Sequence, residues 1–258
     1  MQFYISHLIE DSTFLNLLDH YSLGIESIHF SISDVLDQGI HSISPYVDTL
    51  MPYIQQRPLI LHGPFFDLSP ASFDSQIKAV TFNRFNLAYD IAKKLGAKKL
   101  IFHTGFIPQI YYTEGWLQNS ILFWKEFMAD KDHAITICIE NVFENEYAPI
   151  LELLTKVNHP AFKFCLDVGH VNAYSSFSLN TWTKALGHYL SHIHVHNNHG
   201  NEDTHLGLEN GTLELTLFLK VIHECYPDTT LTLEIYNVDE LTHSLDYLAL
   251  HHYIKPVS

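Results

Sequence analysis

The stretch KLGAKKLIFHTG (residues 94–105) contains the junction between a predicted helix and a predicted strand. Apolar residues recur at helical spacing over Phe73–Leu95, and Gly96 follows as the expected C-cap of that helix. The run KLIFHTG (99–105) has the composition of a buried strand and carries His103 near its end. A helix followed closely by a buried strand is the repeating unit of an α/β protein.

The same unit recurs along all 258 residues. Helical spacing is also found over residues 13–21, 213–225 and 238–251, and strands are predicted at residues 3–6, 26–31, 59–63, 99–105, 135–141, 162–169, 191–197 and 231–236. Eight strand–helix units without a linker predict a single α/β domain over residues 1–258 with the (β/α)8 TIM-barrel fold. A doubly wound open sheet is the alternative, but it usually has fewer strands, and no glycine-rich phosphate loop follows the first strand.

The composition is that of a soluble globular protein, with 47% hydrophobic and 17% charged residues. No apolar run approaches the roughly 18 residues that a membrane span needs, and the first residues do not resemble a signal peptide. The three cysteines, Cys138, Cys165 and Cys225, are widely spaced, and we expect reduced thiols. These features predict a cytoplasmic protein with no membrane partner.

Polar residues stand at the ends of six consecutive predicted strands. In strand order they are His62, His103, Glu140, Asp167, His194 and Glu234, and His170 follows Asp167 three residues later. In a TIM barrel the carboxyl ends of the strands carry the chemistry. Because buried carboxylates without a cation cost several kcal/mol, a divalent metal is the expected partner of these acids and imidazoles. A nitrogen and oxygen donor set without thiolate favours Zn, Mn, Fe or Co over Mg or Ca, and we expect one to three ions, with Zn or Mn as the leading candidates.

The motifs LHGPF, FHTG, IEN, LDVGH, HIHVHNN, DTHL and LEIY carry these residues and resemble the xylose isomerase-like TIM-barrel superfamily. That superfamily also contains the endonuclease IV family (AP endonuclease family 2), whose members are trinuclear zinc phosphodiesterases. The resemblance runs over nearly the whole chain. It implies three overlapping ligand sets: His62, His103 and Glu140; Glu140, Asp167, His194 and Glu234; and His170, Asp203 and His205.

The sugar isomerases and epimerases of the same superfamily keep mainly the second set. The resemblance therefore implies a metal held by Glu140, Asp167, His194 and Glu234, with Glu140 and Glu234 as the catalytic residues that move protons at the carbon beside a carbonyl. One residue departs from the pattern, since Asn197 stands where relatives commonly have an aspartate. Any support that this aspartate gives to the metal site is weaker or different here.

The stretch HIHVHNNHGNEDTH (192–205) divides into a strand and a loop. The two-residue period of a strand predicts that His192, His194 and His196 share one face. Of these three, His194 occupies the ligand position and His192 is expected deeper in the barrel. His196 is expected either at the rim or beside a metal ligand that it supports. We expect Asp203 and His205 to return toward the same metals and His199 to be solvated. Seven further histidines are expected at the surface or at helix ends: His29, His41, His159, His223, His243, His251 and His252.

The predicted loops at the mouth of the barrel contain no Lys or Arg, and the net charge is −15. We therefore expect no nucleic-acid partner, because the phosphates of nucleic acids are bound mainly by cationic side chains. The same absence disfavours a phosphorylated sugar. Aromatic residues are available to stack on a sugar or to pack across the mouth, and Phe66, Tyr112 and His196 are the predicted substrate contacts.

The favoured function is a metal-dependent isomerase or epimerase of a small sugar or related hydroxy-carbonyl compound. Two alternatives remain open. One is an endonuclease IV-like multinuclear hydrolase that acts on small phosphate esters. The other is a metal- or sugar-binding barrel without turnover, or a lyase of the same superfamily. Nothing in the sequence predicts an oligomer interface.

Overall fold

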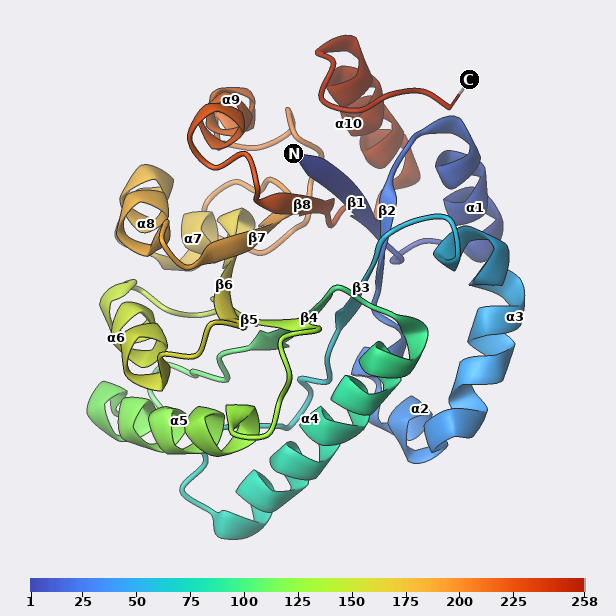
Figure 1. The fold of residues 1–258 in the computed structure, drawn as a ribbon. Helices are drawn as coiled ribbons and strands as arrows, with labels where there is room; N and C mark the ends of the chain where they lie inside the picture. The colour runs from blue at the N-terminus through green and yellow to red at the C-terminus, as the bar shows by residue number, and fades with distance from the viewer. Residues whose placement is uncertain (258) are drawn as a thin grey trace.

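Eight parallel strands close into a barrel in sequential order, and the helices surround it (Figure 1). The computed structural model describes residues 1–257, except for the side chains of residues 40, 42, 44, 45 and 47. The strands are β1 (Gln2–Ser6), β2 (Gly24–Ser27), β3 (Leu59–His62), β4 (Lys99–His103), β5 (Thr136–Glu140), β6 (Phe162–Asp167), β7 (Leu190–Val195) and β8 (Thr230–Leu233). Because β8 pairs with β1, the sheet has no free edge, and the open-sheet alternative is wrong.

The helices lie between successive strands on the outside of the barrel (Figure 1). They are α1 (Asp11–His20), α2 (Ser33–Asp37), α3 (Ile43–Ile54), α4 (Ser75–Leu95), α5 (Thr113–Met128), α6 (Ala148–Val157), α7 (Val168–Tyr174), α8 (Leu179–Leu186), α9 (Leu215–Cys225) and α10 (Val238–Leu250), with short 3₁₀ turns η1 (His29–Ser31) and η2 (Gly39–Ser42) after β2. None of these helices is both long and apolar enough to cross a membrane.

The predicted strand over residues 26–31 is only half correct. Pairing of β2 with β3 stops at Ser27, and the backbone then turns into η1, where the Ser31 amide donates to the Ile28 carbonyl at 3.0 Å. This turn gives the chain a sharp change of direction at the carboxyl end of β2. It places the partly buried His29 at the start of η1 and at a cavity wall. Of the two positions expected for His29, the surface or a helix end, it takes the second.

Helix α4 has the predicted C-cap, but only part of its apolar stripe is buried. Gly96 takes the left-handed conformation at φ 72°, and its amide donates to the Ala92 and Lys93 carbonyls. The buried side chains follow the helical steps at Thr81, Phe85, Ala88, Tyr89, Ile91 and Ala92. Val80 and Leu87 lie one residue, about 100°, around the axis from this stripe and are exposed, as is Ile77.

Two hydrophobic layers hold the barrel together. The larger lies between the strands and the helices and includes three fully buried tryptophans, Trp116, Trp124 and Trp182. The smaller lies within the barrel and consists of Tyr4, Ile60, Ile101, Cys138 and Cys165. All three cysteines are free, and Cys225 is exposed. The inner layer supports the polar residues at the carboxyl ends of the strands.

Candidate metal centre

The strand ends place the predicted ligands around one point. His62, His103, Glu140 and Asp167 are the last residues of β3, β4, β5 and β6, and Glu234 directly follows β8. In the strand register His103 lies beside Glu140, and Asp167 lies beside His194. All six strand-end residues face the interior of the barrel mouth because parallel pairing brings the carboxyl ends of neighbouring strands to the same level.

Glu140 lies between two groups of imidazoles. Its Oε2 atom is 3.4 Å from His62 Nε2 and 3.7 Å from His103 Nε2. Its Oε1 atom is 3.3 Å from His194 Nδ1. One carboxylate thus faces two candidate metal positions, as the bridging role implied by the family resemblance requires.

The Nδ1 atom of His194 faces three carboxylates. It lies 3.3 Å from Glu140 Oε1, 3.6 Å from Glu234 Oε1 and 3.9 Å from Asp167 Oδ2. The residue is fully buried, and this nitrogen makes no hydrogen bond with any residue that the structure describes. The other ring nitrogen, Nε2, contacts Glu26 Oε1 at 2.9 Å. A buried nitrogen surrounded by acids is the arrangement that a divalent cation completes.

A second cluster contains His170, Asp203 and His205, and His196 joins it. Asp203 Oδ2 is 3.1 Å from both His170 Nε2 and His205 Nε2. The Nδ1 atoms of the same two histidines donate to the carbonyls of Asn141 and Glu234, which aims both Nε2 atoms at Asp203. His196 Nε2 lies 3.1 Å from Asp167 Oδ1 and 3.6 Å from Asp203 Oδ1. His196 therefore connects the second cluster to the first.

Asn197 has a structural role in the loop that carries Asp203 and His205. Its side-chain amide donates to the Leu208 and Leu213 carbonyls, and its Oδ1 accepts from the Asn198 and Leu213 amides. A carboxylate could not donate to two carbonyls. The departure from the family pattern at this position thus secures the loop of residues 197–213 to the end of β7.

The pKa values reflect the crowding of acids and imidazoles. Burial raises the pKa of Glu140, but the charges of His194 and His103 outweigh this effect and hold it well below the usual value. Burial lowers the pKa of His194, but surrounding acidic groups, among them Cys165 and Glu234, raise it well above the usual value. For His103 burial dominates and lowers the pKa to about 3. The acids around His194 thus stabilise positive charge there, which a proton or a metal ion can supply.

The donor set fits a metal. The groups whose ligand atoms lie within 4.8 Å of one another include His62, His103 and Glu140; Glu140, Asp167 and His194; Glu26, His194 and Glu234; and His170, His196, Asp203 and His205. Glu140 Oε2, His194 Nδ1 and Asp203 Oδ1 are buried without a hydrogen-bond partner among residues 1–257. Buried polar atoms are rarely left unpaired, and here they belong to the chemical types that zinc and manganese bind.

A cavity of about 450 Å³, here called the central cavity, opens over these groups and is lined by His62, His103, Glu140, His170, Asp203, His205 and Glu234 together with Leu8, Ile28, Ser31, Ile32, Phe65, Phe66, Val142 and Tyr236. Phe66, one of the predicted substrate contacts, lines it and is 61% exposed. The other two predicted substrate contacts do not line it. Tyr112 is 85% exposed and precedes α5, and His196 is buried beneath the cavity, stacked on His205 with ring centroids 3.8 Å apart.

The sequence interpretation missed Glu26. This carboxylate is fully buried inside the barrel and contacts His194 Nε2 at 2.9 Å and His192 Nε2 at 3.1 Å. Thr232 also donates to it. A single charged residue within the apolar segment of residues 23–28 was the available signal, but it lies before the end of its strand, where ligands were not expected. His192 is fully buried below His194, as predicted, and His199 is exposed.

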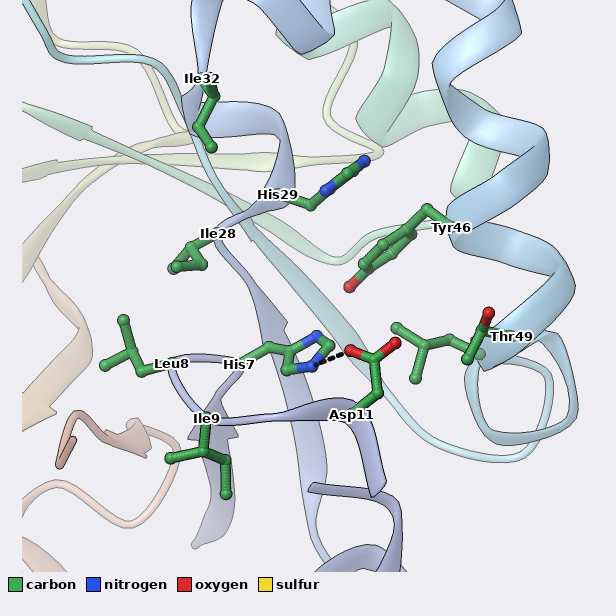
Figure 2. Close-up of a pocket in the computed structure, with 10 residues that line it drawn as sticks. His7, Leu8, Ile9, Asp11, Ile28, His29, Ile32, Tyr46 and Thr49 are labelled. Atoms are coloured by element: carbon green, nitrogen blue, oxygen red, sulfur yellow. Dashed lines mark ion pairs between the residues drawn. The ribbon is translucent and has the colours of Figure 1, made fainter. Parts of the chain in front are cut away.

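A second cavity adjoins the first. It is lined by His7, Leu8, Ile9, Asp11, Ile28, His29, Ile32, Tyr46, Thr49 and Leu50, and it is called the side cavity below (Figure 2). It lies beyond the ends of β1 and β2, against α3. The six other histidines expected at the surface or at helix ends are exposed, apart from His159, which is partly buried.

The comparison with known families agrees with this geometry. A family model described as "Xylose isomerase-like TIM barrel" matches residues 21–251. The chain belongs to this family.

The two relatives and the solved structure described next are each less than 25% identical to this chain. An uncharacterized protein of Methanocaldococcus jannaschii, MJ1311, is 24% identical over 233 residues, which are 85% of this chain and 80% of that protein. A probable endonuclease 4 of Mycoplasmopsis pulmonis is 23% identical over 198 residues, or 69% of this chain and 70% of that protein. The crystal structure of a D-tagatose 3-epimerase-like protein has a TM-score of 0.83 at 21% identity and covers 98% of this chain and 97% of its own. The last comparison establishes a shared fold.

Proposed function

We propose that this member of the xylose isomerase-like family is a metal-dependent isomerase or epimerase of a neutral sugar or a related hydroxy-carbonyl compound. The observation that carries the proposal is the position of His194 Nδ1 within 4 Å of carboxylate oxygens from Glu140, Asp167 and Glu234. These four side chains come from strands β5, β6 and β7 and the end of β8, and together they form a compact site for one divalent ion.

A divalent ion bound there would polarise a substrate carbonyl and stabilise the negative charge that develops when the adjacent carbon loses its proton. The residues of the chain supply the proton transfer. Glu140 and Glu234 are buried carboxyl groups at the floor and wall of the central cavity, and each can accept or return a proton through its Oε atoms. Burial raises the pKa of Glu234, whereas nearby imidazoles lower that of Glu140.

The central cavity favours a neutral substrate. None of its lining residues is Lys or Arg, so a phosphate group would meet mainly carboxylates and imidazoles. Phe65, Phe66 and Tyr236 line it and offer ring faces for the apolar side of a sugar. The volume of about 450 Å³ lies within the range of small-molecule sites.

A multinuclear phosphoesterase is the second candidate. It is supported by the cluster of His170, His196, Asp203 and His205, which can hold an ion of its own, and by similarity to a protein named probable endonuclease 4. The lack of cations around the cavity argues for a small ester rather than DNA as its substrate. A barrel that binds metal or sugar without turnover is the third candidate.

The test is an activity screen of the manganese-loaded and the zinc-loaded protein on neutral aldoses and ketoses, with bis(4-nitrophenyl) phosphate as the hydrolase substrate. We expect isomerisation or epimerisation of at least one sugar, and its loss in Glu234→Gln. A variant with unchanged sugar turnover would disprove the role of Glu234. Phosphoesterase activity without sugar turnover would support the second candidate instead.

A further inference from the structure

The side cavity and the central cavity are neighbours at the mouth of the barrel and share part of their lining. Their volumes are about 490 Å³ and about 450 Å³. Leu8, Ile28 and Ile32 line both, so these three aliphatic side chains form the boundary between them. A molecule that reaches from one cavity into the other would contact these aliphatic side chains at the boundary.

The side cavity belongs to the same end of the barrel. His7 directly follows β1, and Ile28 directly follows β2, so its near wall is made of strand ends like those that carry the metal ligands. Tyr46 of α3 forms the opposite wall, and Figure 2 shows its ring facing the space between the two strands' ends. The cavity thus occupies the position of a substrate pocket in a TIM barrel rather than that of a crevice between outer helices.

Flat rings line much of this cavity. The His29 ring stacks on Tyr46 with centroids 4.6 Å apart and planes inclined by 10°. The His7 ring stacks on Phe14 with centroids 4.1 Å apart. Each stack fixes an imidazole in orientation, so its ring edge and nitrogens are held in place before a ligand arrives.

The polar groups of the side cavity suit hydroxyl groups. His7 Nε2 lies 3.0 Å from Asp11 Oδ1, and Figure 2 shows the other ring nitrogen pointing away from Asp11, toward the space near Tyr46. Burial lowers the pKa of both His7 and His29, which keeps the imidazoles neutral near pH 7. Asp11 is the one carboxylic acid among the lining residues, and none of them is Lys or Arg. These groups can bind the hydroxyls of a neutral ring but cannot neutralise a phosphate or carboxylate.

We propose that the side cavity binds a second, neutral sugar ring, so that the substrate is a disaccharide whose reducing end lies at the metal centre. This inference rests on the proposed function, because it takes the central cavity as the site of the reacting sugar. Aliphatic and aromatic walls with a few hydroxyl-binding groups match the two faces of a pyranose, which carries both C–H surface and hydroxyls.

The test compares matched sugars by isothermal titration of the manganese-loaded protein. D-fructose is compared with turanose, lactulose and isomaltulose, which attach a neutral hexose at O3, O4 and O6 of fructose. D-glucose is compared with maltose and cellobiose. We expect at least one disaccharide to bind tenfold or more tightly than the monosaccharide at its reducing end.

Two variants test whether the gain in affinity for the disaccharide comes from the side cavity. Asp11→Asn removes the charge of a largely exposed side chain, and His7→Phe removes the nitrogens but keeps a ring against Phe14. We expect each to lower the affinity for that disaccharide at least fivefold and the affinity for the monosaccharide less than twofold. His188→Phe, at an exposed position before β7 and therefore at the opposite end of the barrel, is the matched control and is expected to change neither.

The outcomes separate this inference from the function on which it rests. If monosaccharides bind and no disaccharide binds more tightly, or if both variants keep the full disaccharide affinity, the side cavity is not a sugar subsite, and the proposed function stands. If the metal-loaded protein binds neither class of sugar, the proposed function fails and this inference fails with it.

Discussion

The imidazole of His194 contacts the carboxylate of Glu26 through Nε2 at 2.9 Å. Because a carboxylate accepts, Nε2 carries the proton, and Nδ1 is left to face Glu140, Asp167 and Glu234. Glu26 is in turn fixed by contacts with His192 and Thr232. This chain of contacts orients the ring that our account places on the metal, as the outer partners of metal-bound histidines do in other proteins.

Replacing Glu26 should therefore weaken metal binding. We expect Glu26→Gln to lower the affinity for Zn²⁺ by about 10- to 100-fold, because the neutral amide holds the Nε2 proton less strongly. Competition with a fluorescent chelator measures this affinity, and nitrogen-15 NMR reports the tautomer of His194. Glu152→Gln, at an exposed position on α6, is the control. An unchanged affinity would show that Glu26 serves only the packing of the barrel interior.

The number of ions distinguishes the two enzymatic candidates. For the isomerase we expect one ion per chain after mild purification, held by Glu140, Asp167, His194 and Glu234. Inductively coupled plasma mass spectrometry measures the content, and Asp203→Asn, which alters the second cluster, should leave it at one. Two or three ions per chain, falling when Asp203 is replaced, would argue for the multinuclear phosphoesterase.

Glu144 predicts a pH-dependent stability. Burial raises the pKa of this carboxyl group to about 7, although it accepts hydrogen bonds from Thr104 and from the Val142 amide. Since its pKa is higher in the folded than in the unfolded chain, the folded state binds more protons between about pH 4.5 and 7. The free energy of unfolding should therefore fall as the pH rises through that window.

In Glu144→Gln this contribution is absent. We expect the free energy of unfolding of the variant, relative to the parent, to increase by about 3 kcal/mol between pH 4.5 and pH 8, because the pKa of about 7 lies more than two units above the value of an unfolded chain and one pKa unit corresponds to about 1.4 kcal/mol. Urea unfolding at the two pH values measures the difference. A constant offset between the two proteins would contradict the raised pKa.

Gly169 lies against the candidate metal centre. A Cβ atom added there would come within 1.9 Å of His196 Cε1, and both residues are buried. Gly169→Ala should therefore destabilise the fold by about 1 to 3 kcal/mol and displace His196 from Asp167. Thermal unfolding and the histidine NMR signals test this expectation. A variant with unchanged stability and unchanged His196 signals would contradict the close packing.

The sequence predicted the barrel and most of its strand ends for a physical reason. A buried parallel strand is a continuous apolar run, so a terminal His62 or Glu140 interrupts it visibly. Glu26 was missed because it lies within the barrel at a level where apolar side chains are expected. Tyr112 was misplaced because the direction of a loop side chain depends on tertiary packing that no local pattern records. The role of Asn197 depends in the same way on carbonyls that are distant in sequence.

Exchange of substrate hydrogen with solvent tests the proposed proton transfer by Glu140 and Glu234. The manganese-loaded protein is incubated in D₂O with neutral aldoses and ketoses, and proton NMR follows the hydrogens beside the carbonyl. We expect at least one sugar to exchange such a hydrogen for deuterium and chelation of the metal to stop the exchange. We expect Glu140→Gln and Glu234→Gln to lower the exchange rate by about 10²-fold or more. Absence of exchange in every sugar, or full exchange in both variants, would contradict the proposed proton transfer.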